Sequence, residues 1–108
     1  MIIRGGENIY PIEIENELLE LDAVKEVAAI GLPNERWGEE VAVVVHLHRG
    51  ESLSEEALLS FARDRLAGYK VPTRVFFSER ELPRNATNKV LKRELKTGLL
   101  AALEAEKS

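Results

Sequence analysis

Residues 41–47, Val-Ala-Val-Val-Val-His-Leu, constrain the fold more than any other segment. A run that is nearly continuous in valine and alanine predicts a β-strand. Residues 24–32 are similarly apolar, with Gly31 and Pro33-Asn34 as a closing turn signal, and residues 75–77 predict a short third strand. The chain must therefore build a small sheet, whose apolar surface needs helices to cover it.

Three helices are predicted around these strands. Pro11 suits the first position of a helix, because its missing N–H has no helical partner there. Ser54 is a favourable N-cap for the second helix, and Gly68 is the expected residue just after its end. The third helix is expected to begin near Val90 or Leu91. The apolar residues at helical spacing are Ile14, Leu18 and Leu21, then Leu58, Phe61, Ala62 and Leu66, and finally Leu91, Leu95, Leu99 and Leu103.

Residues 2–4 and 9–10 can form the arms of a hairpin, because Gly5-Gly6 supplies the positive φ angles of a tight turn. The expected order is hairpin, helix, strand, strand, helix, strand, loop, helix. We therefore expect an α+β fold, in which helices pack on a small central antiparallel sheet of about three strands and a β-hairpin stands at the N-terminus. At 108 residues, positions 1–108 make a single domain.

Size and composition exclude several classes of protein. A chain of 108 residues buries a modest core but not a deep cleft, which favours part of a catalytic unit over a complete enzyme. The net charge of −4 argues against a nucleic-acid partner. No apolar run approaches the roughly 20 residues of a membrane span, and residues 1–3 are too short for a signal peptide, so a cytoplasmic location is expected. Because the chain has no cysteine, and His46 and His48 are interpreted as surface or edge-strand residues, no metal site is expected.

The segment 82–95, Leu-Pro-Arg-Asn-Ala-Thr-Asn-Lys-Val-Leu-Lys-Arg-Glu-Leu, puts one lysine after a loop of turn-forming residues and before an amphipathic helix. Such a loop can hold the long side chain of Lys89 away from the domain surface. A compact ammonium group can stabilise the negative charge that develops on a phosphate. Taken alone, the basic residues of this segment are also typical of a solvated helix face. They are Lys89, Lys92, Arg93 and Lys96.

The run from Pro83 through Asn88 to Lys89 is accompanied by residues 2–15, Ile-Ile-Arg-Gly-Gly-Glu-Asn-Ile-Tyr-Pro-Ile-Glu-Ile-Glu. Both runs resemble the small C-terminal domain of the adenylate-forming enzymes, which include acyl-CoA synthetases, luciferases and the adenylation domains of peptide synthetases. Many relatives have Gly where this chain has Asn88, and Asn also tolerates the left-handed conformation. The resemblance covers essentially the whole chain and implies that Lys89 is the catalytic lysine of adenylation.

The glycine loop carries a second implication of this resemblance. In acyl-CoA synthetases, a loop similar to Gly5, Gly6, Glu7 and Asn8 swings into the active site after adenylation and lines the tunnel that guides pantetheine. Glycine lets a main chain approach a ligand closely. Peptide-synthetase domains usually have Phe or Tyr after the first Gly and lack the Glu-Asn pair, so this string favours a CoA ligase.

Two further segments resemble the CoA-contacting surface of aryl- and acyl-CoA ligases. The resemblance implies that Trp37 contacts pantetheine. The residues that would meet the nucleotide end of CoA are Tyr69, Lys70 and Arg74, since rings stack on adenine and cations pair with phosphates. Packing roles for all four residues stay open. Val71 stands where some aryl-CoA ligases have Arg, which weakens the assignment of a 3′-phosphate contact.

The resemblance implies that the chain is the C-terminal lid of a larger two-domain enzyme, an acyl-CoA or fatty-acid–CoA ligase. ATP and a carboxylic acid would form an acyl-adenylate and pyrophosphate, and CoA would then displace AMP. A large N-terminal domain in cis is the expected partner, and Mg²⁺ is expected in the full enzyme but not on this domain. The isolated domain is expected to be inactive. The alternatives are a lid of a carrier-protein-loading adenylation enzyme and a free-standing protein-docking module.

Overall fold

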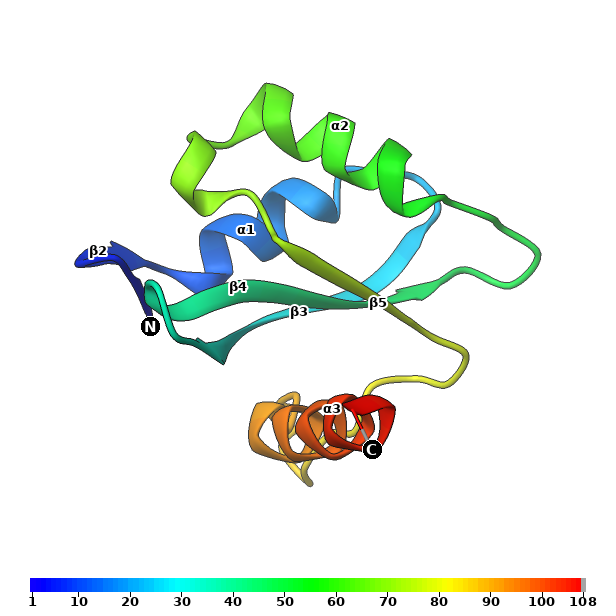
Figure 1. Ribbon diagram of the computed structural model, residues 1–108. Coiled ribbons are helices and arrows are strands. Elements are labelled where there is room, and N and C mark those ends of the chain that lie inside the picture. The colour runs from blue at the N-terminus through cyan, green and yellow to red at the C-terminus, as the bar shows by residue number, and fades with distance from the viewer. Residues whose placement is uncertain (108) are drawn as a thin grey trace.

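The computed structural model describes residues 1–107 and has the expected α+β architecture. Helices α1 and α2 cover one face of a sheet, and α3 covers the other (Figure 1). The elements are β1 (Ile2–Arg4), β2 (Glu7–Ile9), α1 (Pro11–Leu18), β3 (Val24–Asn34), β4 (Gly38–Leu47), α2 (Glu55–Arg65), a 3₁₀ turn η1 (Gly68–Lys70), β5 (Arg74–Ser78) and α3 (Lys92–Lys107).

The sheet is larger than the sequence predicts, with five strands in the order β2-β1-β4-β3 and with β5 paired to β4. The N-terminal hairpin is part of it, because Arg4 pairs with Gly38. β5 runs parallel to β4, since α2 carries the chain back across the sheet before β5 begins. β4 is thus the central strand, so His46 does not lie on an edge strand; it is half-buried, with Nδ1 3.0 Å from the carbonyl oxygen of Ser78, whereas His48 is exposed as predicted.

The turn between β3 and β4 lies later in the chain than predicted. Pro33 and Asn34 belong to β3, and the chain reverses over residues 35–37. The side-chain oxygen of Asn34 accepts hydrogen bonds from the backbone N–H groups of Arg36 and Trp37, each at 2.9 Å. An asparagine that bonds the backbone after it promotes a turn beyond itself, which explains the shift.

The helix ends are partly as predicted. Ser54 caps α2 by accepting from the N–H of Ala57 at 3.0 Å. Gly68 does not terminate α2, because the helix ends at Arg65 and the extended residue Leu66 turns back into the core. α3 begins at Lys92, slightly later than predicted, since the N–H of Leu91 instead closes the preceding loop on Pro83 at 2.8 Å.

The apolar run of β4 is explained by burial on both sides. Val41, Val43 and Val45 belong to the core under α1 and α2. Ala42 and Val44 belong to a second core that is packed against α3. Alternation along a strand thus buries two apolar faces, which is why the run is continuous. Within residues 1–107, no helix is long and apolar enough to cross a membrane.

Candidate functional site

The loop that carries Lys89 is closed around one side chain. Asn85 Oδ1 accepts from the N–H of Thr87 at 3.0 Å, from its hydroxyl at 2.8 Å and from the N–H of Lys89 at 3.0 Å. The N–H of Asn85 in turn donates to the carbonyl oxygen of Lys89 at 2.9 Å. An isolated bridge between Arg84 and Val90 closes the base of the loop. The backbone of Lys89 therefore has a defined position within the loop, although its side chain is exposed.

Asn88 adopts the conformation that the sequence predicts for it. Its φ of 66° is the only positive φ of a non-glycine residue in the described chain. Asparagine is one of the few residues that reach this left-handed region at low cost. Its N–H donates to the carbonyl oxygen of Asn85 at 2.9 Å, which helps to direct the following residue out of the loop.

The basic residues of this segment differ in their surroundings. Lys92 pairs with the half-buried Glu15 at 2.8 Å, and Lys96 lies 4.0 Å from Glu39. Lys89 forms no ion pair within residues 1–107. It lies before α3 begins, so it does not belong to the basic stripe of that helix. Lys89 lines an open hollow, which Ile12 of α1 also lines. The cation is thus available to an outside anion.

The glycine turn and Trp37 lie together, which the sequence did not predict. Gly5 and Gly6 have φ angles of 56° and 84°, as expected for a tight turn. The N–H of Gly5 donates to the carbonyl oxygen of Trp37 at 2.8 Å, and a Cβ on Gly5 would lie 3.5 Å from the indole ring. A Cβ on Gly6 would meet nothing within 4 Å, so this side of the turn is open. Glu7 and Asn8 follow as the exposed residues of β2.

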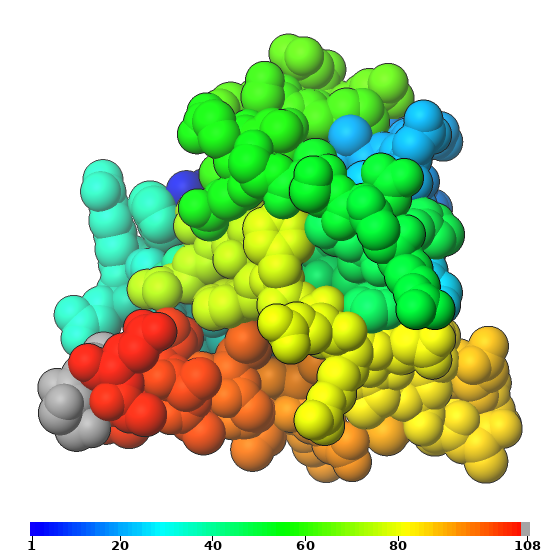
Figure 2. Space-filling model, turned by 90° about the vertical axis from the view of Figure 1, so that its right-hand side faces the viewer, coloured from blue at the N-terminus to red at the C-terminus, as the bar shows by residue number. Residues whose placement is uncertain are grey.

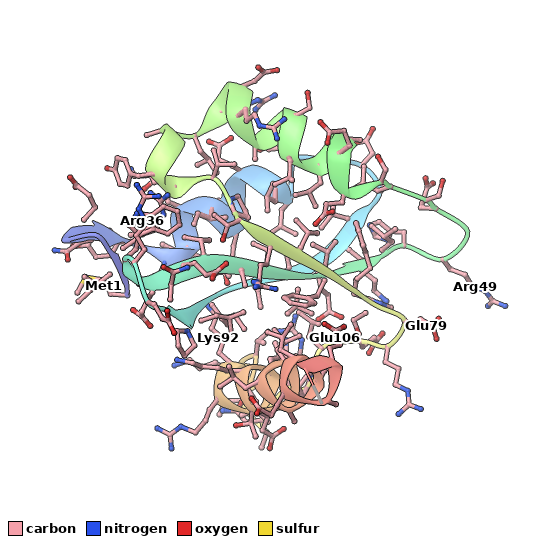
Figure 3. All side chains as sticks on the ribbon, in the orientation of Figure 1. Met1, Arg36, Arg49, Glu79, Lys92 and Glu106 are labelled. Carbon is pink, nitrogen blue, oxygen red and sulfur yellow. The ribbon has the colours of Figure 1, made fainter. Side chains whose placement is uncertain are left out.

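Two arginines that the sequence analysis did not select lie against Trp37. The guanidinium of Arg4 is 3.9 Å from the indole centroid, and that of Arg36 is 5.4 Å from it. Arg4 Nε is buried without a hydrogen-bond partner in the described chain. Arg36 lies at the end of the molecule that carries the hairpin (Figure 3). The only sequence signal for these two arginines was adjacency, because Arg4 directly precedes Gly5 and Arg36 directly precedes Trp37.

Tyr69 and Lys70 lie on η1 and remain close to each other. The ammonium of Lys70 is 5.5 Å from the Tyr69 ring and donates to both carboxylate oxygens of Glu13, at 2.9 and 3.0 Å. The hydrogen bond to Glu13 raises the pKa of Lys70 above its usual value. Lys70 is therefore cationic at neutral pH, but part of its charge is already compensated.

Arg74 is separated from this pair by its position on β5. Its Nε donates to Glu40 at 3.1 Å, and its side chain lines a hollow beside α3. Burial acts to raise the pKa of Glu40, but hydrogen bonds from Asn34 and Thr73 and the charge of Arg74 outweigh it and lower that pKa. The structure therefore does not bring Arg74 together with Tyr69 and Lys70. Within residues 1–107, no group of three or more His, Cys, Asp or Glu side chains is arranged to hold a metal ion.

Comparisons with known proteins give relatives of this chain in sequence and in structure. The family model of the AMP-binding enzyme C-terminal domain matches residues 13–89. The chain is 52% identical over 96 residues to a 2-succinylbenzoate–CoA ligase of Geobacillus kaustophilus, and 49% identical over 96 residues to a feruloyl-CoA synthase of an Amycolatopsis species. Each match covers 89% of this chain and 19% of the relative. A solved Mycobacterium tuberculosis fatty acyl CoA synthetase has a TM-score of 0.86 and 46% identity, over 94% of this chain and 20% of that one.

Proposed function

The chain belongs to the family of AMP-binding enzyme C-terminal domains, and from this we propose that it is the C-terminal lid of a larger, two-domain, AMP-forming ligase. The enzyme would join a carboxylic acid to CoA. Because the chain spans only about a fifth of the length of its curated relatives, the large adenylate-forming domain would supply the rest of the active site. ATP and CoA are the proposed co-substrates, and Mg²⁺ would be held by that other domain.

Lys89 is the proposed catalytic residue of the first step. When the carboxylate attacks ATP, negative charge increases around the α-phosphate while pyrophosphate leaves. A cation that is held in place and screened from water stabilises this charge more in the transition state than in the ground state. The observation that carries the proposal is the position of Lys89 at the end of a closed loop, exposed and without an ion-pair partner in residues 1–107.

The glycine turn is the proposed surface for the second step. Pantetheine would pass along Gly5 and Gly6, beside Trp37, and the CoA thiol would displace AMP from the acyl-adenylate. The lysine loop and Tyr69, which is proposed to meet CoA, belong to opposite faces of the sheet. Leu82 and Val90, which flank the lysine loop, pack on the α3 side, whereas Tyr69 packs on the side of α1 and α2. Figure 2 shows residues 80–90, in yellow to gold, at one end of the base formed by α3, and the turn between β3 and β4, in cyan, on the other side. Two separated surfaces suit a lid that rotates between the steps.

The nature of the acyl acceptor and of the acid is also part of the proposal. The Glu7-Asn8 string supports CoA rather than a carrier protein, and the relatives named above are CoA ligases. Those relatives are named for different acids, a succinylbenzoate, a feruloyl group and a fatty acyl group, although all match this domain. The acid would therefore be selected by the larger domain.

Separate assays of the two half-reactions in the complete enzyme test the proposal. Lys89→Ala should slow formation of the acyl-adenylate about 10²- to 10³-fold, as expected for loss of one transition-state contact to a developing charge. Conversion of supplied acyl-adenylate to acyl-CoA should continue. Lys96→Ala, which removes a neighbouring exposed cation, is the control and should leave both rates unchanged. An equal loss in both half-reactions for Lys89→Ala would reject the role given to Lys89.

A further inference from the structure

A buried carboxylate lies beneath the lysine loop. Glu26 is on β3, and its side chain is only 9% exposed. Its Oε1 accepts from the backbone N–H of Leu82 at 3.2 Å. Its Oε2 accepts from Arg84 Nε at 3.2 Å and from Arg84 Nη2 at 2.7 Å. Glu26 thus bonds the residues where the chain enters the loop.

Arg84 extends this contact to the far end of the loop. While Nε and Nη2 face Glu26, Nη1 donates to the backbone carbonyl oxygen of Asn88 at 2.8 Å. Asn88 is the residue with the left-handed φ and directly precedes Lys89. The planar guanidinium therefore connects the buried strand to the peptide unit from which Lys89 projects. A lysine could not replace it, because an ammonium group lacks the rigid set of five donors.

The two sets of hydrogen bonds at this loop have different effects. The bonds to Asn85 join residues 85–89 to one another, so they define the shape of the loop. The bonds of Arg84 and Leu82 to Glu26 join the loop to the sheet, so they define its direction. An ion pair on a buried carboxylate adds little net stability compared with apolar residues of the same volume, so we interpret the hydrogen bonds between Glu26 and Arg84 by the geometry that they define.

We propose that Glu26 and Arg84 form a positioning pair, which aims Lys89 for the adenylation step. The inference rests on the proposed function of Lys89. Neither side chain would touch the reacting atoms. Catalysis by a fixed charge is sensitive to its placement, and an error of about 1 Å in a positioned group can cost on the order of 100-fold in rate. Loss of the pair should therefore affect the half-reaction that uses Lys89 and spare the other.

Two conservative variants of the complete enzyme separate this role from folding. Arg84→Lys keeps the positive charge beside Glu26 but loses the simultaneous bond to Asn88. Glu26→Gln keeps the size of the side chain and an oxygen for Leu82 but removes the charge that attracts Arg84. The matched control is Glu81→Gln. Glu81 pairs with Lys25 at 3.0 Å, and both side chains are exposed. Lys25 directly precedes Glu26 and Glu81 directly precedes Leu82, so the control pair links the same two segments but does not include a residue of the lysine loop.

Three measurements are made on each variant: acyl-adenylate formation, thioester formation from supplied acyl-adenylate, and amide hydrogen exchange of the loop. For Arg84→Lys we expect adenylation to fall about 10- to 100-fold, thioester formation to be unchanged, and the amides of Asn88 and Lys89 to exchange faster. Glu26→Gln should act in the same direction. Glu81→Gln should match the unmodified enzyme in all three.

The outcomes distinguish this inference from the function on which it rests. If Arg84→Lys adenylates at the normal rate, or if it loses both half-reactions equally, the positioning role is wrong. Should Glu26→Gln fail to fold, Arg84→Lys still decides, because the Arg84 side chain is 36% exposed and its replacement leaves no buried charge without a cation nearby. If Lys89→Ala in the same assay spares adenylation, the proposed function of Lys89 is wrong, and the positioning role that rests on it is wrong as well. A strong Lys89 effect with no Arg84 effect overturns only the positioning pair.

Discussion

The backbone N–H of Gly5 donates to the carbonyl oxygen of Trp37 at 2.8 Å. This bond joins the turn between β1 and β2 to the turn between β3 and β4, which are distant in the sequence. The indole ring also lies in van der Waals reach of the position that a Cβ of Gly5 would occupy. The glycine turn and the tryptophan, which the sequence presents as separate motifs, therefore form one continuous surface.

Gly6→Leu should impair thioester formation and spare adenylation, the reverse of Lys89→Ala. A side chain at Gly6 would enter the open space beside the turn, where we propose that pantetheine passes. The positive φ of 84° also strains any larger residue, by about 1–2 kcal/mol. Gly50→Leu is a matched control, because Gly50 has a φ of 82° and equally open surroundings in a different loop. Normal CoA-dependent turnover of Gly6→Leu, assayed beside the control, would count against the tunnel.

Trp37→Ala should raise the KM for CoA and leave the rate of acyl-adenylate formation unchanged. The change removes the ring against which Arg4 and Arg36 lie, at 3.9 and 5.4 Å from its centroid. Each CH₂ of pantetheine that the ring shields from water contributes about 0.8 kcal/mol, so the loss of one or two such contacts should raise the KM about four- to fifteenfold. Trp37→Phe should recover part of the loss, since a phenyl ring still presents a π face. Steady-state kinetics with varied CoA measure the effect, and an unchanged KM in Trp37→Ala would indicate a packing role only.

Leu58→Ala should destabilise the domain by about 2–5 kcal/mol, because the side chain of Leu58 is fully buried between α2 and the sheet. Leu100→Ala makes the same chemical change at an exposed position of α3, where Leu100 is 38% exposed at the hollow that Arg74 also lines, and should cost only about 0.5 kcal/mol. Urea unfolding followed by circular dichroism compares the two. Similar losses would mean that the core under α1 and α2 does not dominate the stability of the domain.

Local patterns predicted much of this fold. The run in β4, the Ser54 cap and the positive φ angles at Gly5, Gly6 and Asn88 follow from the preferences of single residues or short segments, and all are present. The parallel pairing of β5 was not predictable in this way. It depends on where α2 returns the chain relative to β4, which is a property of the tertiary packing.

The candidate site shows the same division. Lys89 was selected from the sequence because its loop has a recognisable pattern, but Glu26 and Arg84 were not selected. Lys25 and Glu26 are adjacent charges at the start of β3, where the pairing with β4 is irregular between Val24 and Glu26. Simple alternation therefore does not tell which of the two charges is buried. Only the packed structure shows that Glu26 turns inward to meet Arg84, while Lys25 remains at the surface.

Glu40 should make the stability of the domain depend on pH. Hydrogen bonds from Asn34 and Thr73, with the charge of Arg74, lower its pKa below the ordinary 4.5, against the opposing effect of burial. A carboxyl whose pKa is lower in the folded state binds protons more weakly there than in the unfolded chain. Its contribution to stability is therefore fully present above pH 4.5 and is lost as the pH falls through the folded-state pKa.

Glu40→Gln should remove this part of the pH dependence. The amide can still bond Asn34 and Thr73, but it does not titrate, so the variant should lose less stability than the unmodified chain between neutral pH and the region below 4.5. Glu51→Gln, an exposed glutamate in the loop before α2, is the control and should keep the original slope. Urea unfolding across a pH series measures the free energy of unfolding of all three proteins. If Glu40→Gln and the unmodified chain have parallel profiles, the network around Glu40 does not lower its pKa in solution.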